Sequence, residues 1–175
     1  MKILVCGGRN FGHVMRTKAD TEKESQETKK RVAEYKYIHD VLHAYVMAYS
    51  KERNDQDNWL PTDIVIIEGG ATGADSAAAD FGLINFCPVK EFKADWHKYG
   101  TSAGPIRNRQ MLEQGKPDLV IAFPGGKGTA NMVAQATAYK VPVTLYDGIS
   151  LPKLTPTADE VRGILSSPRP KQDQQ

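Results

Sequence analysis

The sequence predicts an α/β fold of the Rossmann-like kind, in which helices cover both faces of a parallel β-sheet to give a three-layer sandwich. Three observations carry this prediction. Short, almost continuously apolar runs such as KILVC at residues 2–6 recur along the chain, and they are typical of strands buried on both faces. Helix-forming segments separate these runs, which favours a parallel sheet. Glycine-rich turns follow three of the predicted strands.

The predicted elements alternate regularly through the second part of the chain. After the first strand at residues 2–6, we expect further strands at residues 63–67, 89–92, 118–123 and 141–146. Helices are expected at residues 76–82 and 105–114, and from the glycine turn near residue 126 to residue 139. This order places the strands in one sheet with both faces covered.

A charged segment interrupts the pattern after the first strand. Between residues 16 and 60, nine Lys or Arg residues are balanced by nine Asp or Glu residues, so the segment is solvated and is not a basic arm. Apolar residues recur at three- and four-residue steps from Val32 to Tyr49, which predicts one amphipathic helix over about 28–53. This helix would cover the sheet or pair with a second subunit. Residues 16–27 are expected to form a mobile loop or a frayed helix start.

Length, composition and charge narrow the class of protein. The chain has 175 residues, 40% of them hydrophobic, which suits one domain over residues 1–150 with an insertion at about 13–60. Residues 151–175 are expected to form a tail that is disordered at its end. The net charge of +2 gives no general attraction to polyanions. No apolar run approaches the roughly 18 residues of a membrane helix, so we expect a cytoplasmic protein.

The three glycine-rich turns form the candidate ligand site. They read CGGR at residues 6–9, EGGATGAD at 68–75 and PGGKGT at 124–129. Because the carboxyl ends of parallel strands share one edge of the sheet, the turns should converge there. Glycine lets the backbone approach a ligand closely, and the free N–H groups of a helix start attract a phosphate or carboxylate. The alternative is that these are only tight turns.

Two further segments add candidates. Pro105 suits the first position of a helix, which would put Arg107 and Arg109 in its first turn, where the helix dipole repels cations unless an anion compensates. Solvated arginines are the alternative. Trp96 would stack on a base or pack as part of a lid. The predicted ligand-binding set is Gly7, Gly8, Arg9, Gly69, Gly70, Thr72, Gly73, Asp75, Trp96, Arg107, Asn108, Arg109, Pro124, Gly125, Gly126, Gly128 and Thr129.

The common phosphate and metal signatures are missing from the sequence. A P-loop has Lys after its last glycine, whereas Lys127 precedes Gly128, and no GxGxxG stands before a suitably spaced acidic residue. NAD chemistry and ATP-driven motor chemistry are therefore not expected, and no cofactor is predicted. His39 and His43 have the spacing of a zinc helix but lack a third ligand, so no metal site is predicted.

Four segments in order resemble one known family. CGGR, GGATGAD, ADWHKYGTSAGPIRNRQM and PGGKGT are similar to motifs of the YspA-like (DUF2493) branch of the SLOG superfamily, relatives of the lysine decarboxylase-like LOG enzymes and the DprA/Smf DNA-processing proteins. The resemblance covers about residues 1–147 apart from the charged insertion. It implies binding of a nucleotide or a nucleotide-derived ligand, ADP-ribose-like or a nucleoside phosphate. It also implies a homodimer or larger homo-oligomer, as in LOG relatives.

The same resemblance leaves two chemical outcomes open. LOG enzymes release the base of a nucleoside 5′-monophosphate and carry PGGxGTxxE, but Met132 stands where that glutamate belongs. Cleaving the bond requires a carboxylate, so Asp75 and Glu68 are the tentative catalytic residues of a phosphoribohydrolase-like N-glycosidase. Asp75 also suits a helix start for electrostatic reasons alone.

We expect binding without cleavage, as a sensor or sponge in nucleotide signalling. In this interpretation the turn at 124–129 and the two arginines hold a phosphate, and the turn at 69–75 holds the sugar or a second phosphate. DNA binding in the manner of DprA is the third alternative, and it lacks a basic stripe with interleaved aromatic residues.

Overall fold

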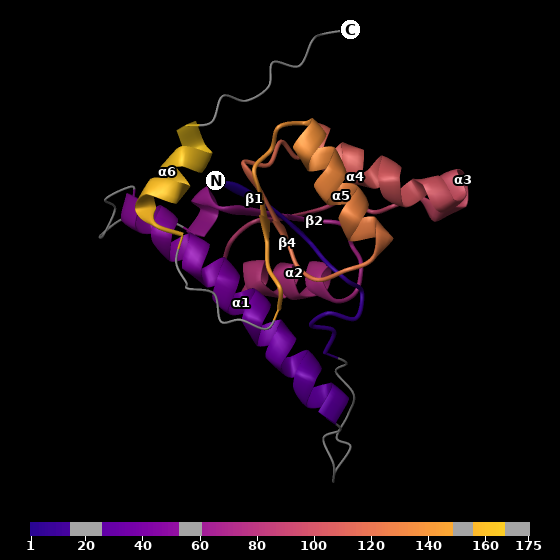
Figure 1. Cartoon of the computed structure of the whole chain (residues 1–175), viewed down its shortest axis with the longest axis horizontal. Coiled ribbons are helices and arrows are strands. Elements are labelled where there is room, and N and C mark those ends of the chain that lie inside the picture. Colours follow the sequence, from indigo (N-terminus) through magenta and orange to yellow (C-terminus); the bar gives the residue numbers. More distant parts are fainter. Residues whose placement is uncertain (15–25, 53–60, 149–155, 167–175) are drawn as a thin grey trace, which may run out of the picture.

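A computed structural model describes residues 1–14, 26–52, 61–148 and 156–166 (Figure 1). Within these ranges, five strands pair in parallel in the order β3-β2-β1-β4-β5. The strands are β1 (Lys2–Cys6), β2 (Val65–Glu68), β3 (Val89–Glu91), β4 (Leu119–Ala122) and β5 (Val143–Leu145). The predicted α/β fold is therefore confirmed. The strand order reverses between β1 and β4, which is where ligands bind in open sheets of this kind.

Helices cover both faces of the sheet and complete the three layers (Figure 1). On one face lie α1 (Gln26–Glu52), α2 (Ala74–Ile84) and α6 (Ala158–Ser166). On the other face lie α4 (Ala103–Glu113) and α5 (Lys127–Ala138). The short helix α3 (Trp96–Tyr99) and a 3-10 turn (Gly100–Ser102) connect β3 to α4. Among the helices described, none is both long enough and apolar enough to span a membrane.

Strand β1 is apolar at every position after Lys2 because both of its faces are covered. Ile3 and Val5 pack into the core beneath α1 and α2, whereas Leu4 and Cys6 pack into the core beneath α4 and α5. Neighbouring side chains on a strand point to opposite faces, so a strand covered on both sides needs apolar residues throughout.

The charged insertion forms part of the core. Helix α1 matches the predicted helix closely, and its residues Tyr37, Val41 and Tyr45 are buried against the sheet. It therefore covers the sheet, as one of the two interpretations expected. Of the segment predicted as a mobile loop or a frayed helix start, Gln26 and Glu27 open the helix, and residues 16–25 lie outside the described residues.

Two expectations about helix boundaries were wrong. Helix α4 begins at Ala103, since a 3-10 turn leads directly into it, so Pro105 is its third residue and Arg107 lies beyond its first turn. The predicted tail contains α6, whose Val161 is fully buried beside α1. The remaining elements match their predictions to within two residues. The predicted disorder after residue 166 lies outside the described ranges.

A capping box starts α6 and was visible in the sequence. The N–H of Glu160 donates to Thr157 Oγ1 at 3.2 Å, and the N–H of Thr157 donates to Glu160 Oε2 at 2.7 Å. This reciprocal pair satisfies two donors of a helix start, and its Thr-x-x-Glu spacing is a recognised signal for one.

Candidate ligand-binding site

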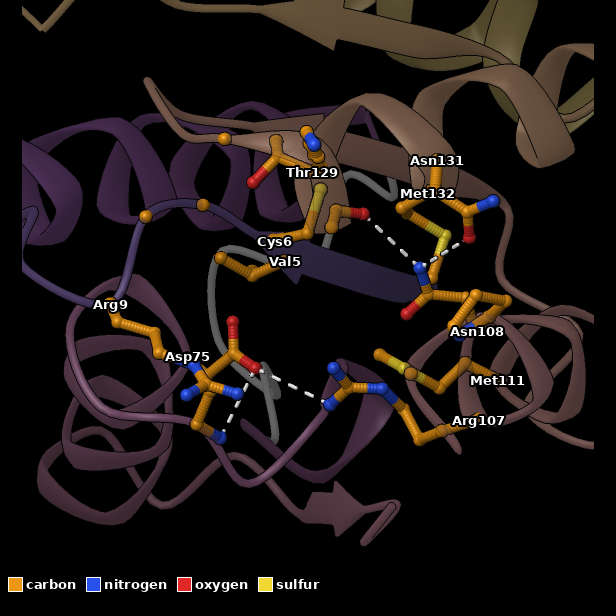
Figure 2. Close-up of a pocket in the computed structure, with 18 of the residues that line it drawn as sticks. Val5, Cys6, Arg9, Asp75, Arg107, Asn108, Met111, Thr129, Asn131 and Met132 are labelled. Atoms are coloured by element: carbon orange, nitrogen blue, oxygen red, sulfur yellow. Dashed lines mark hydrogen bonds and ion pairs between the residues drawn. The ribbon is translucent and has the colours of Figure 1, made fainter. Parts of the chain in front are cut away.

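A pocket of about 530 Å³ lies at the carboxyl edge of the sheet, beside the ends of β1 and β4 (Figure 2). Residues from all three glycine turns line it, so the turns converge as predicted. The predicted residues that line it are Gly7, Gly8, Arg9, Asp75, Trp96, Arg107, Asn108, Gly126, Gly128 and Thr129. The predicted residues outside it are Gly69, Gly70, Thr72, Gly73, Arg109, Pro124 and Gly125, together with Glu68.

The start of α5 offers free hydrogen-bond donors to this pocket. Gly126 caps the helix, and among the described residues no side chain provides a capping hydrogen bond to it. The first internal bond of the helix runs from the Ala130 N–H to Gly126 O at 3.0 Å. No atom lies within 4 Å of the position that a Cβ would take on Gly126 or Gly128. The N–H groups of this turn therefore remain available to an anion, and the positive end of the helix dipole favours one.

Lys127 is a pocket residue that the sequence analysis did not select. It is exposed, lines the pocket and occupies the first position of α5, where the helix dipole disfavours a cation. A bound anion would offset this repulsion between Lys127 and the helix dipole. The residue was passed over because it is out of place for a P-loop lysine.

The second glycine turn is less open to an anion than we expected. Asp75 Oδ2 accepts from the N–H groups of Gly69 at 3.2 Å and Ala71 at 3.3 Å. Glu68 Oε2 accepts from the N–H of Gly70 at 2.6 Å. Because the protein's own carboxyl groups occupy these three donors, the turn is less suited to a phosphate than the sequence predicts. It supplies the pocket with Ala71 and Asp75.

The glycines of the first turn serve packing. The N–H of Gly8 donates to Pro124 O at 2.8 Å, which ties the turn after β1 to the turn after β4. A Cβ on Gly8 would lie 2.9 Å from that oxygen, and a Cβ on Gly7 would lie 2.5 Å from Ala74 Cβ. Glycine is required here because the backbones approach closely.

Arg107 is already paired within the protein. Its Nη1 donates to the carbonyl oxygen of Gly69 and lies 3.7 Å from Asp75 Oδ2, and Figure 2 shows the side chain reaching toward that carboxylate. Because α4 begins earlier than predicted, Arg107 faces the turn after β2. Arg109 is exposed and lies outside the pocket. Arg107 therefore lines the pocket while it is paired with Asp75, whereas Arg109 lies away from the predicted site.

Asp75 is the acidic residue among the described side chains that line the pocket. Burial raises its pKa to about 6, although the Arg107 charge and the N–H groups of the turn oppose that rise. One of its oxygens carries the contacts given above, and the other points into the cavity (Figure 2). That oxygen can accept a hydrogen bond from a ligand hydroxyl or, once protonated, donate one.

Asn108 joins α4 to the start of α5. Its Nδ2 donates to Gly128 O at 3.2 Å and to Asn131 Oδ1 at 2.9 Å, and Gln135 Nε2 donates to the same Asn131 oxygen at 2.8 Å. Asn108 is buried, so this network holds the donor-bearing turn against the pocket. Asn131 lines the pocket and was missed from the sequence.

The remaining pocket wall is apolar. Met111 and Met132 are buried and line it together with Val5 and Cys6. Burial raises the pKa of the Cys6 thiol to about 12, so this group is neutral and unreactive. Met132 thus contributes only apolar surface to the pocket.

No cluster of three or more potential metal ligands occurs in the part of the chain that the structure describes. His39, one of the two histidines with zinc-helix spacing, packs against the rings of Tyr35 and Phe81.

Glu68 should make the stability of the protein fall as the pH rises. Burial raises its pKa from the ordinary 4.5 to about 7, so between these values the folded protein keeps a proton that the unfolded chain has lost. The contribution of Glu68 to the free energy of unfolding is therefore greatest below about pH 4.5, and it is lost as the pH rises through about 7. Glu68→Gln should reduce that loss by roughly 1 to 3 kcal/mol.

Urea unfolding near pH 5 and pH 8 measures this effect. Asp63→Asn, a change at an exposed carboxyl group just before β2, is the matched control and should keep the wild-type pH dependence. An unchanged pH dependence in Glu68→Gln would contradict the assignment.

The comparisons with known proteins give one relative. No protein-family model matches the chain, and no solved structure matches it significantly. The Gene 61 protein of Mycobacterium phage D29 is 34% identical to the chain over 97 residues, an alignment that covers 51% of the chain and 76% of the phage protein.

Proposed function

We propose that this chain, which belongs to the family of the Gene 61 protein of Mycobacterium phage D29, binds a nucleotide or a nucleotide-derived ligand. The phosphate of that ligand lies at the start of α5, between Gly126 and Thr129. The observation that carries the proposal is an uncapped helix start, with glycines open to solvent, at the edge of a pocket of about 530 Å³.

The chemistry of the pocket supports a ligand with three different parts. The start of α5 and Lys127 suit a phosphate, the free oxygen of Asp75 suits a sugar hydroxyl, and Met111 and Met132 suit an apolar surface. The resemblance to the SLOG superfamily favours the same class of ligand. A protein that holds such a ligand without cleaving it would act as a sensor or a sponge.

Cleavage of the N-glycosidic bond is the second candidate function. The observation that favours it is Asp75, a buried carboxyl group whose pKa is raised to about 6, near the range in which it could transfer a proton. Against it, the position of the LOG glutamate holds the buried Met132. Binding alone is therefore the preferred function.

Thermal unfolding in the presence of AMP or ADP-ribose tests the proposal. A ligand at about 100 times its dissociation constant should add about 2.7 kcal/mol to the free energy of unfolding and raise the melting temperature. Chromatography of the same mixtures for free base separates the two functions, since a binding protein yields no product beyond one equivalent. Unchanged melting temperatures with both compounds would count against the proposal.

A further inference from the structure

Trp96 and Arg9 form a stacked pair at the rim of the pocket. The guanidinium carbon of Arg9 lies 5.7 Å from the centroid of the Trp96 ring, and both residues line the pocket. Trp96 is 51% exposed, whereas both cores of the fold exclude it. An indole half open to solvent beside a cavity is a large flat surface that a ligand can cover.

The indole is held in a fixed place. Trp96 begins α3, and Asp95 caps that helix by accepting from the Lys98 N–H at 2.9 Å. The Cβ position of Gly104 lies 3.5 Å from Trp96 Cη2, so the first turn of α4 packs beside the ring. A surface positioned in advance binds a flat partner with little loss of conformational entropy.

Arg9 can leave the indole without disturbing the fold. Its carbonyl oxygen accepts from Thr72 Oγ1 at 3.0 Å, which fixes the backbone, but its side chain is exposed. A cation–π contact at an exposed site is weaker than the stacking of a base on an aromatic ring. A base can therefore take the place of the guanidinium.

We infer that Trp96 stacks on the base of the bound ligand, in the place that Arg9 occupies in the free protein. This inference rests on the proposed function and narrows it, because the ligand must carry an aromatic base in addition to the phosphate held by α5. Sugar phosphates without a base would bind through the start of α5 and Asp75 but would make no contact with Trp96. Trp96 is then the residue that determines specificity for nucleotides over sugar phosphates.

Equilibrium binding of AMP and ribose 5-phosphate tests this assignment. Trp96→Ala should weaken AMP binding about tenfold or more, the size expected for one base–aromatic stack, and leave ribose 5-phosphate binding unchanged. Trp96→Phe should retain most of the affinity for AMP. Tyr99→Ala is the matched control, since Tyr99 lies on the same short helix, is 38% exposed and is outside the pocket.

Fluorescence gives a direct readout of the stack. The chain has two tryptophans, so in a Trp59→Phe background the emission comes from Trp96 alone. AMP should quench this emission, whereas ribose 5-phosphate should bind and leave it unchanged.

The outcomes separate the two proposals. If AMP binds Trp96→Ala as tightly as it binds the wild type, the stacking is wrong and the phosphate site stands. Equal losses of AMP affinity in Trp96→Ala and Tyr99→Ala would place the effect in the folding of α3 and overturn the stacking. If neither AMP nor ribose 5-phosphate binds the wild type, the proposed function fails and the inference fails with it.

Discussion

Replacing Arg107 by alanine is expected to lower the free energy of unfolding by about 3 kcal/mol near pH 8. The change leaves the buried Asp75 carboxylate without its cation and the Gly69 carbonyl without its donor. Removing one partner of a buried ion pair is costly because the other charge stays away from water. Urea unfolding followed by circular dichroism measures the loss.

The same variant has a matched control and a pH signature. Arg109→Ala changes an exposed arginine two positions further along α4 and should cost less than about 0.5 kcal/mol. Because the pKa of Asp75 is about 6, this group is largely protonated in the folded protein near pH 5, and the loss caused by Arg107→Ala should shrink there. Equal losses in the two variants, or the same loss at both pH values, would contradict the buried pair.

Replacing Thr129 by aspartate is expected to weaken AMP binding by at least about 100-fold. The loss is this large because several charge-assisted hydrogen bonds to the phosphate are lost together. Thr129 is the third residue of α5 and lines the pocket. A carboxylate at this position repels the phosphate and can itself accept from the helix start. Since acidic side chains stabilise the first turn of a helix, the unfolding free energy should stay the same or rise.

Thr129→Asn is the control for this variant, because asparagine has nearly the shape of aspartate without its charge. It should retain much more affinity than Thr129→Asp. Isothermal titration with AMP gives the affinities, and urea unfolding gives the stabilities. Wild-type affinity in Thr129→Asp would mean that the phosphate lies elsewhere.

The fold followed from the sequence because local patterns determine most of it. The strand at residues 2–6 is apolar at every position after Lys2. The turn at 124–129 has three glycines beside a helix start, and both patterns are short-range signals. Helix α6 was missed although Val161, Ile164 and Leu165 have helical spacing and its capping pair, Thr157 and Glu160, was readable.

The site was predicted only in part, because a glycine has the same appearance in the sequence whether it serves packing or a ligand. Gly8 is required by the closeness of Pro124, whereas Gly126 faces open space. Nothing near Arg107 in the chain reveals that Asp75 is its partner. By contrast, the carboxyl groups of Glu68 and Asp75, which occupy the donors of the second glycine turn, stand close to Gly70 in the sequence, and only their orientation could not be predicted.

The central claim is that the N–H groups at the start of α5 receive the ligand's phosphate, and amide NMR tests it most directly. Addition of AMP to the labelled protein should shift the amide signals of Lys127, Gly128 and Thr129 more than those of Gly69, Gly70 and Ala71, whose N–H groups are already bonded. Saturable shifts centred on the second glycine turn, or no shifts at residues 127–129, would contradict the claim.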